Sequence, residues 1–549
     1  MAWSLFPRAL GAVFLISFLS ASTQLLGLVG SRGLEPAAFL FAAIKRDLDP
    51  LRRALYFPSL FLISTADWFL MAVCLAGVAA SAAIVVGGGT FSPYLFLTVW
   101  ICWLSIQVSN PTLFSFPWDL LVTECAFFGA LLPAGGGTPL PAVQFYFNWL
   151  LFRVMFGMGL TRFRERGPTE RNLTYIFHFL QWQPKPTPVA AALRRLPMWC
   201  HRLAYGFLFW TEVLMPLAMF GPPWLRTVAG ASFVLLQLGI WATGNYGTFN
   251  VLTIVLCLPL LAPLPPVGEL LRFGPSGFET SVTIGILLHT VAGLPSVFIF
   301  NFWSGSLWLF QRDALRETSL AWILRPLAAA LRVIAPFRVL NSYGVFRYQS
   351  VYVEDRLVVR LQGTADGFAW RDYEPRFLTS QEGTRPPFFA PHHPRLDHFL
   401  FYGLCEDTSF KVFMLMACNP YYFDPFCLTE KLVQKLLRAD AVALSFFRAN
   451  PFPDGRPIAV RYALYRYRFT APAERRATGR WWESECLGAS EAIGLTDVDA
   501  STGIRPTYDR FIAATQSRGT FTVREFVDPR TGTAVPMHLH TIRRHVTVA

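Results

Sequence analysis

Three ionisable residues lie inside an apolar stretch that carries almost no other charge. Residues 116–164 are expected to form two apolar helices joined by a Pro/Gly-rich turn at 131–141, and Asp119, Glu124 and Arg153 fall within them. Ionisable groups at membrane depth are costly, so they are usually paired or line a wet cavity. At about 1.5 Å of rise per residue, Arg153 lies between the two carboxylates in depth. We expect a buried Arg–carboxylate contact; the alternative is one acid at the interface and an Arg153 that extends towards water.

A loop further along the chain contains residue types that bind metals. These are His392, His393, Asp397 and His398. Adjacent histidines in an extended loop point apart, and the spacing matches no zinc motif. The sequence also has no nucleophile elbow, Walker loop or dinucleotide fingerprint. We therefore expect no catalytic residue, no metal and no cofactor.

The composition points to a membrane protein with a water-soluble part. Of 549 residues, 53% are hydrophobic and only 15% are charged, against about 25% charged residues in a soluble chain. Long uncharged runs fill residues 1–311, whereas 340–549 has an ordinary soluble composition. The net charge of +13 favours anionic lipid head groups as partners, and no nucleic-acid motif is present.

The predicted fold is a multi-pass α-helical membrane domain with about seven to eight spans, followed by a β-rich (α+β) soluble C-terminal domain. The expected parts are a polytopic domain at 1–304, an interfacial amphipathic connector at 305–340, the soluble domain at 341–486 and a polar extension at 487–549. The candidate segments for these seven to eight spans are the two helices of the hairpin at 116–164, then 9–31, 68–90, 91–114, 203–225, both halves of 227–268, and 280–303.

Finer features of the helical part can also be predicted. An amphipathic helix is expected on the membrane face at 32–58. The span at 203–225 contains one charge, Glu212. The sequence GNYGTFN at 244–250 predicts a polar kink at which Asn245 and Asn250 satisfy opened backbone groups.

Strand patterns appear in the soluble domain at 351–363 and 458–470. In the second strand the apolar positions change parity between Leu464 and Tyr465, which indicates a bulge or a change of covering surface. Two or three helices are expected between the strands, within 395–449.

Two modifications depend on which side of the membrane the chain faces. The four cysteines of the soluble part, Cys405, Cys418, Cys427 and Cys486, could form two disulfides in an oxidising compartment, in any of three connectivities. Asn172 begins a glycosylation sequon, which matters only on the lumenal side. The basic loop of 161–202 around it favours the cytoplasmic side by the positive-inside rule, so the two signals conflict.

Many separate motifs make the chain similar to the lipase maturation factor family. In the soluble part these are LQGT at 361–364, WRDYEPRF at 370–377, RPPFFAPHHPRLD at 385–397, DAVALSFFRANPFPD at 440–454, YRYRF at 465–469 and GRWW at 479–482. In the helical part they are RVMFGMGLTRFR at 153–164, RNLT at 171–174, QPKPTP at 183–188, His201-Arg202, Glu212 with Pro216, and GNYGTFN. The resemblance covers roughly residues 30–485, while FLQWQP at 179–184 replaces the family's HYETQP and lacks its His and Glu.

The resemblance implies a multi-pass protein of the endoplasmic reticulum membrane, or of the inner membrane if the source is bacterial. Its C-terminal domain would face the lumen and help dimeric secreted lipases to fold and assemble, as a chaperone-like factor and not an enzyme. Secreted lipases and membrane lipids would be its partners.

Residues of the soluble domain are candidates for client binding. The aromatic candidates are Trp370, Tyr373, Tyr465, Trp481 and Trp482, for which the alternative is packing in a small core. Arg385, Arg395 and Asp397 flank the Pro-rich loop, and we expect them to hold this loop by ion pairs and backbone bonds; a client-gripping role is the alternative.

Two other functions compete with the folding factor. A membrane enzyme distantly like vitamin K-dependent carboxylase would bring Asp119, Glu124, Arg153 and Glu212 into one pocket. A lipid or small-molecule carrier would need a continuous apolar cavity that opens to the bilayer.

Overall fold

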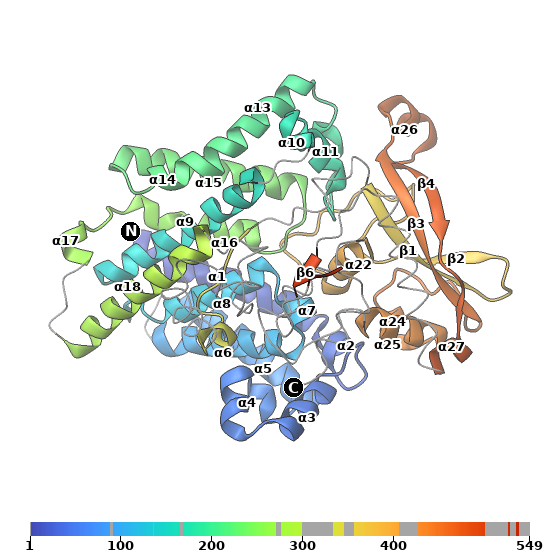
Figure 1. Cartoon of the computed structure of the whole chain (residues 1–549), viewed down its shortest axis with the longest axis horizontal. Coiled ribbons are helices and arrows are strands. Elements are labelled where there is room, and N and C mark those ends of the chain that lie inside the picture. The colour runs from blue at the N-terminus through green and yellow to red at the C-terminus, as the bar shows by residue number, and fades with distance from the viewer. Residues whose placement is uncertain are drawn as a thin grey trace.

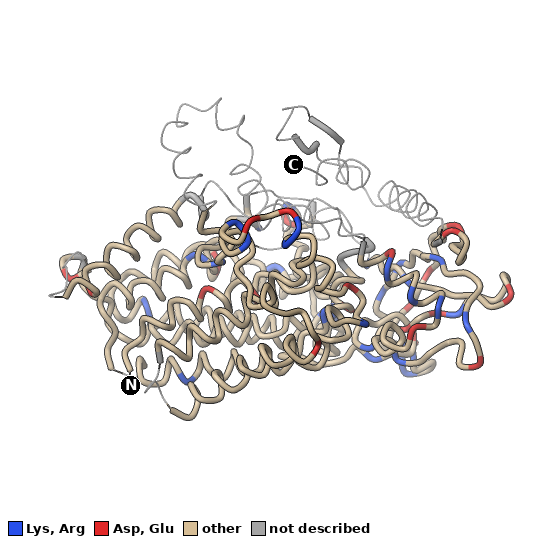
Figure 2. Tube along the Cα trace, turned by 90° about the horizontal axis from the view of Figure 1, so that it is seen from below, with Lys and Arg blue, Asp and Glu red and all other residues tan. Residues whose placement is uncertain are grey.

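The computed structural model describes residues 2–87, 92–134, 137–164, 168–270, 276–298, 333–344, 356–405, 427–499, 525–527 and 534–536. Helices form one end of the molecule and a β-sheet forms the other (Figure 1). Charged residues are sparse along the long helices and gather over the sheet end (Figure 2). Residues 305–332 of the predicted connector, and most of the predicted C-terminal extension, lie outside the described residues.

Long apolar helices build the first part of the chain. They are α1 (Ala2–Ser22), α5 (Asp67–Gly87), α6 (Ser92–Ser109), α9 (Pro141–Arg164), α15 (Pro223–Thr243) and α18 (Gly277–Phe298). Within the described ranges, four helices are long and apolar enough to cross a membrane: α1, α5, α15 and α18 up to Leu294. Two apolar helices, at Pro93–Ser109 and Phe249–Leu261, are shorter. A membrane domain is thus supported, while the number of spans stays a prediction.

Helix α8 (Pro117–Gly129) differs from the span that the hairpin pattern predicts. It has 13 residues, or about 20 Å of helix, which is too short for a hydrocarbon core of about 30 Å. Every residue of α8 except Phe127 is buried. Its apolar character therefore reflects burial among other helices, which hydropathy cannot distinguish from burial in lipid.

Shorter helices connect and cover these elements. Before α8 they are α2 (Leu25–Val29), α3 (Ala37–Asp47), α4 (Pro50–Tyr56) and α7 (Pro111–Phe114). After α9 they are α10 (Pro168–Arg171), α11 (Tyr175–Trp182), α12 (Pro188–Leu193), α13 (Met198–Phe209), α14 (Met215–Ala218), α16 (Phe249–Leu256) and α17 (Val267–Leu270). The predicted amphipathic segment at 32–58 corresponds to α3 and α4, and a π-helical turn at Trp210–Leu214 joins α13 to α14.

The sheet is antiparallel with the strand order β2–β1–β3–β4, and β5 pairs with β3. The strands are β1 (Arg356–Thr364), β2 (Trp370–Tyr373), β3 (Ala459–Phe469), β4 (Trp482–Ala489) and β5 (Ile493–Gly494). The register of β3 against β4 shifts between Leu464 and Tyr465, which confirms the predicted bulge. A separate ladder joins β6 (Glu525–Val527) to β7 (Ala534–Pro536).

Helices of the C-terminal part place the sheet against the helical end. These are α22 (Arg395–Cys405), α24 (Cys427–Leu437), α25 (Ala441–Leu444), α26 (Pro472–Thr478) and α27 (Leu495–Asp499). Helix α22 packs on both β1 and α7, and α24 packs on β3. One apolar core contains residues of both ends, including Phe14 and Trp103 of the helices and Tyr462 and Trp482 of the sheet.

A close backbone approach inside this core generates a first prediction. A Cβ atom added to Gly157 of α9 would lie 2.4 Å from the carbonyl oxygen of Tyr343. We expect Gly157→Ala to destabilise the protein by about 1–3 kcal/mol, since the packed backbone must move. Thermal unfolding of the detergent-purified protein measures this loss.

The matched control is Gly206→Ala in α13, where an added Cβ meets nothing within 4 Å. It removes a helical glycine without a clash, so stability should be unchanged or slightly higher. Equal unfolding temperatures for the two variants would contradict the close packing of Tyr343 on α9.

Candidate functional site

Glu124 of α8 is the centre of a buried polar cluster. Its carboxylate pairs with Arg153 of α9 and accepts hydrogen bonds from the Tyr146 hydroxyl at 3.1 Å and the Tyr343 hydroxyl at 2.8 Å. Asn341 donates both its backbone N–H and its side-chain amide to the same carboxylate. The expected Arg–carboxylate contact is therefore present, with Glu124 as the acid.

His289 and the segment at 339–343, where the predicted connector ends, complete this cluster. Arg153 also donates to the Asn341 carbonyl at 3.0 Å, and His289 of α18 lies with Nε2 3.0 Å from the Val339 carbonyl and 3.5 Å from Glu124. The side chains of Glu124 and Arg153 are 0% and 1% exposed. The cluster thus fixes the segment at 339–343 between α8, α9 and α18.

Asp119 has a different partner, which comes from the C-terminal part. Arg395, the first residue of α22, contacts both carboxylate oxygens of Asp119, at 2.5 and 2.8 Å. It also donates to the Leu113 carbonyl at 3.1 Å, and its guanidinium lies 4.9 Å from the Phe114 ring centroid. A two-bond Arg–carboxylate pair fixes both distance and orientation. This pair ties the sheet end to the helical end, and we call it the junction pair.

Polar side chains of the helical part hold the Pro-rich loop that precedes α22. Gln24 donates to the His393 carbonyl and accepts from the Arg395 backbone N–H. Asn245 donates to the Pro387 carbonyl, and its oxygen accepts from the backbone N–H groups of Phe389 and Ala390. Asn245 thus bonds backbone groups of distant segments and not those opened at the kink. Asn250 donates its amide to the Gln237 side chain at 2.8 Å, so the predicted role at the kink is wrong for both residues.

The residues that flank the loop act unequally. Asp397 accepts hydrogen bonds from the backbone N–H groups of Phe377 and Leu378, which is the backbone role expected for it. Arg385 is exposed, and its guanidinium lies 5.8 Å from the Trp481 ring centroid. Since Arg395 and Asp397 are both buried, the alternative in which they grip a client is wrong in this structure.

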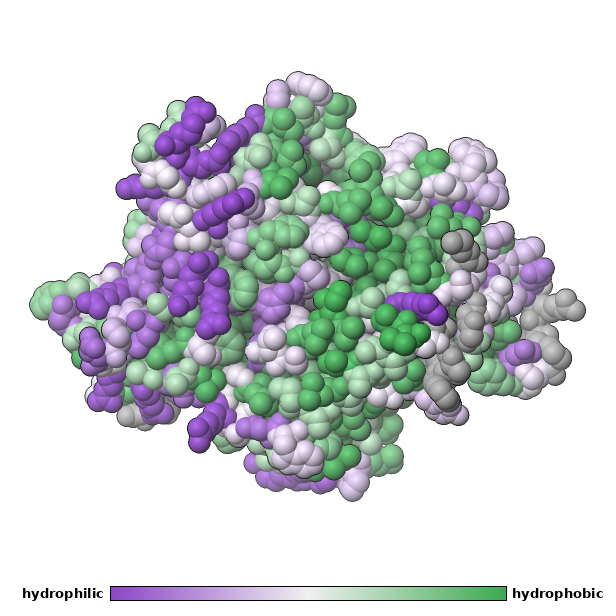
Figure 3. All heavy atoms as spheres, turned by 180° about the vertical axis from the view of Figure 1, so that it is seen from behind, coloured by the Kyte–Doolittle hydropathy of each residue, from purple (hydrophilic) through white to green (hydrophobic). Residues whose placement is uncertain are grey.

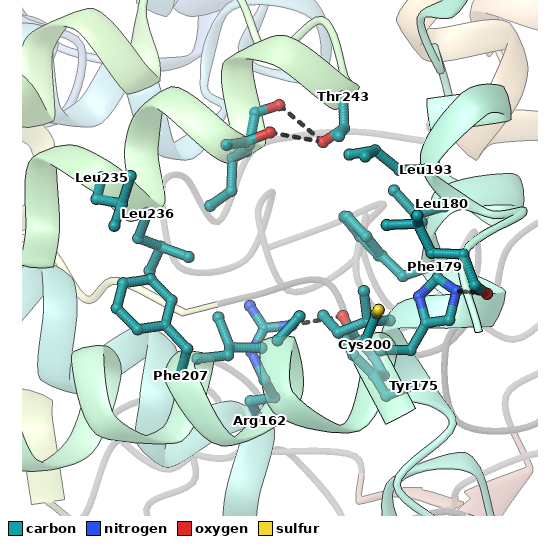
Figure 4. Close-up of a pocket in the computed structure, with 17 residues that line it drawn as sticks. Arg162, Tyr175, Phe179, Leu180, Leu193, Cys200, Phe207, Leu235, Leu236 and Thr243 are labelled. Carbon is teal, nitrogen blue, oxygen red and sulfur yellow. Dashed lines mark hydrogen bonds between the residues drawn. The ribbon is translucent and has the colours of Figure 1, made fainter. Parts of the chain in front are cut away.

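Glu212 forms a third, separate pair. Its carboxylate accepts hydrogen bonds from Arg162 of α9 at 2.9 and 3.3 Å, and Arg162 also bonds the Tyr175 hydroxyl at 2.5 Å. Figure 4 shows Arg162 and Tyr175 at one side of an apolar cavity. Each acid has its own arginine among the described residues, so the four intramembrane charges do not converge on one pocket.

The predicted aromatic surface is only partly exposed. Tyr373 and Trp482 are 1% and 0% exposed, so their assignment to a client surface is wrong and the core alternative holds for them. They are buried because the inner face of a small sheet needs large rings to fill its core. The half-buried rings are Trp370, Tyr465 and Trp481, and each packs against an arginine.

Sequence reasoning missed an exposed hydrophobic group at the tip of the β1–β2 hairpin. Phe368 is 90% exposed, and Ile458 is 54% exposed. The backbone N–H of Ile458 donates to the Thr364 carbonyl at 2.8 Å, which places Ile458 at the end of β1. Together with Trp370 we call these residues the hairpin patch. The sequence TADGF at 364–368 is a turn signal that could have located the tip.

The junction also contains buried ionisable groups outside the spans. Burial lowers the pKa of Lys185 to about 7 and that of His392 to about 4, with Arg395 adding to the effect on His392. Burial also lowers the pKa of His393 and of His398. Burial raises the pKa of Asp397 against its two backbone hydrogen bonds.

The metal-binding residue types, the cysteines and the sequon can be followed in the described part of the chain. No group of three or more His, Cys, Asp or Glu that could hold a metal occurs among the described residues. Cys486 is a free and exposed thiol, which contradicts a disulfide through it; Cys418 lies outside the described ranges, and no pairing is described for Cys405 or Cys427. Asn172 is exposed, and its glycosylation stays a prediction.

Comparison with known proteins gives consistent matches along the chain. Residues 1–263 match the lipase maturation factor transmembrane domain, and residues 339–491 match the lipase maturation factor C-terminal domain. Lipase maturation factor 1 of Bos taurus is 31% identical over 518 residues, which cover 88% of this chain and 86% of the relative. Lipase maturation factor 2 of Mus musculus is 25% identical, over 88% of this chain and 81% of the relative. No solved structure matches the chain.

The junction pair generates a second prediction. We expect Arg395→Met to destabilise the protein by about 3–5 kcal/mol, because it leaves the buried Asp119 charge without a partner. The double variant Asp119→Leu/Arg395→Met should recover much of this loss, since no charge then stays uncompensated. Thermal unfolding in detergent gives the coupling between the two residues.

The exposed Arg385 provides the control, as Arg385→Met removes the same charge from the same loop. Its effect should stay within about 0.5 kcal/mol. The stability losses of Asp119→Leu and Arg395→Met, each measured alone, are added and compared with the loss in the double variant. A double variant as unstable as this sum would contradict direct coupling.

The half-buried His392 generates a third prediction, on pH. The folded-state pKa of His392 lies below its ordinary value of 6.5, so the unfolded chain takes up the proton first on acidification. Stability should therefore fall as the pH drops from about 6.5 to 4, by on the order of 2 kcal/mol for this partly exposed group. The Ser20 hydroxyl lies 2.9 Å from Nδ1 of His392. His392→Gln keeps a side chain able to bond this hydroxyl and should flatten this part of the profile, measured as unfolding temperature against pH. Parallel profiles for variant and parent would refute the assignment.

Proposed function

This chain belongs to the lipase maturation factor family, and we propose that it promotes the folding and assembly of secreted lipases as a membrane-bound factor that is not an enzyme. The observation that carries the proposal is that the family match extends over both ends of the molecule. We also propose residence in the endoplasmic reticulum membrane, with the C-terminal part in the lumen, because a secreted client could meet the sheet only there.

The hairpin patch is the best candidate for client contact. Phe368 is held outward by a well-bonded turn, in which Asp366 accepts the backbone N–H groups of Phe368 and Ala369 at 2.8 Å. Thr364 accepts the N–H of Gly367 at 2.9 Å, and the positive φ of Gly367 suits this tight turn. Because the backbone of this turn is already fixed, binding costs less ordering entropy than it would for a flexible loop.

A working cycle follows from this arrangement. The patch would bind apolar surface on a lipase subunit before assembly, and assembly of the dimer would bury that surface and release the client. Such a role needs surface exposure and a stable base, and it needs no bond-making group. The separate pairing of Asp119, Glu124 and Glu212 gives the membrane-enzyme alternative no specific support.

The fourth prediction tests this role. In cells that lack the protein, we expect secreted lipase to persist as polypeptide while its activity per molecule falls. The parent chain should restore that activity, and Phe368→Asp should restore it poorly, since loss of a central aromatic contact weakens binding by roughly tenfold or more. Lipase activity divided by lipase protein measures the outcome.

Phe388→Asp is the matched control, because Phe388 is also exposed (57%) but lies outside the hairpin patch. Equal rescue by both variants would reject the patch as the client surface while leaving the maturation role intact. Unchanged lipase activity per molecule in the deletion cells would reject the maturation role itself.

A further inference from the structure

An apolar cavity of about 240 Å³ lies between helices of the second half of the helical part. Its walls come from α11, α12, α13 and α15, with Arg162 of α9, and most lining side chains are aliphatic or aromatic (Figure 4). Leu235, Leu236 and Phe207 lie at one side, and Leu180 and Leu193 lie across from them. A cavity of this lining favours a hydrocarbon chain over a polar ligand.

The cavity opens onto a surface that suits lipid. Among its lining residues, Leu193, Leu196 and Leu235 are 38%, 45% and 60% exposed. Trp199 and Leu203 of α13, which supplies part of the wall, are 62% and 65% exposed. Large exposed apolar side chains next to α15, a helix apolar enough to cross a membrane, indicate contact with acyl chains. Figure 3 shows such hydrophobic surface over the helical end.

Arg195 lies beside this opening, and two further arginines lie close enough to act on its charge. Arg195 stands between the lining residues Leu193 and Leu196. Its pKa is lowered by partial burial and by the nearby charges of Arg475 and Arg476 from α26. No ion pair is described for these three arginines within the part of the chain that the structure covers. Glu474 is the one acid of α26, so the positive charges of Arg195, Arg475 and Arg476 outnumber it and favour an anion from outside the chain.

The polar groups inside the cavity are already engaged. The guanidinium of Arg162 donates hydrogen bonds to Glu212 and Tyr175. His201 bonds the Leu196 carbonyl through Nε2 at 3.2 Å. A ligand is therefore expected to place its anionic group outside the cavity, at the arginines, and its hydrocarbon chain inside the cavity. Trp199 fits that geometry, since tryptophan prefers the level of the head groups.

We propose that this cavity and the three arginines form a site for one anionic phospholipid. An acyl chain occupies the cavity, and the phosphate lies on Arg195, Arg475 and Arg476. The lipid then bridges α12 of the helical end and α26 of the sheet end. This site is independent of the lipase role and would exist whether or not the hairpin patch binds clients.

The fifth prediction tests the site on the full chain. After exchange into phosphatidylcholine vesicles with or without phosphatidylglycerol, native mass spectrometry counts the lipids that stay bound. We expect one phosphatidylglycerol on the parent chain. The variant Arg195→Ala/Arg475→Ala/Arg476→Ala should bind it on the order of a hundredfold more weakly, at about fivefold per arginine.

A pair of glycines tests the cavity separately from the charges. An added Cβ meets nothing within 4 Å at either Gly239, which lines the cavity, or Gly206, which does not. Gly239→Leu should fill the cavity and lower phosphatidylglycerol retention, and Gly206→Leu should leave it unchanged. Soluble glycerol phosphate, which lacks acyl chains, should bind far more weakly than the intact lipid.

Several results would overturn the proposal. They are equal retention of phosphatidylcholine and phosphatidylglycerol, equal retention by Gly239→Leu and Gly206→Leu, or glycerol phosphate binding as tightly as the lipid. If the triple variant fails to fold, the parent chain still decides the charge argument. Its retention of phosphatidylglycerol must fall as ionic strength rises, and a salt-independent result would count against the arginines.

Discussion

The structure depends on neutralising charges that the helical part buries. A buried carboxylate without a partner costs several kcal/mol, and Asp119, Glu124 and Glu212 are among those that the helical part buries. Each is neutralised by an arginine on another element. Two of the three acids also bond residues that follow the connector in the chain. Arg395 bonds Asp119, and Asn341 bonds Glu124. The need to pair these acids therefore decides how the two ends of the molecule fit together.

This constraint explains why the sheet end is fixed on the helical end by many contacts. The loop before α22 lies against Gln24 and Asn245, and Arg356 of β1 donates to the Pro184 carbonyl of the QPKPTP loop at 2.9 Å. Lys431 of α24 bonds Glu35 at 3.0 Å. A rigid base of this kind lets the hairpin patch point outward in a fixed direction, and it brings the arginines of α26 near Arg195 of the helical end.

The sequence alone predicted those features that follow from local pattern. The strands, the bulge at Leu464 and Tyr465, the polar break at 244–250 and an arginine contact within the hairpin all came from periodicity or from the cost of burying charge. It could not predict that Asp119 pairs with Arg395, since nothing local links residues so far apart. For the same reason the sequence pattern predicts a span where α8 lies, and it leaves Tyr373 and Trp482 among the surface candidates. Periodicity shows that a side chain is apolar and does not show which element covers it.

The junction pair has a consequence for biosynthesis. Asp119 and Arg395 are 276 positions apart, so a ribosome completes the helices around Asp119 long before it makes the arginine. During that interval the acid is uncompensated, and the bundle cannot reach its final packing. Chains that end early, or whose second half misfolds, would keep that defect and be open to degradation. The pair thus makes stability of the first half conditional on a complete second half.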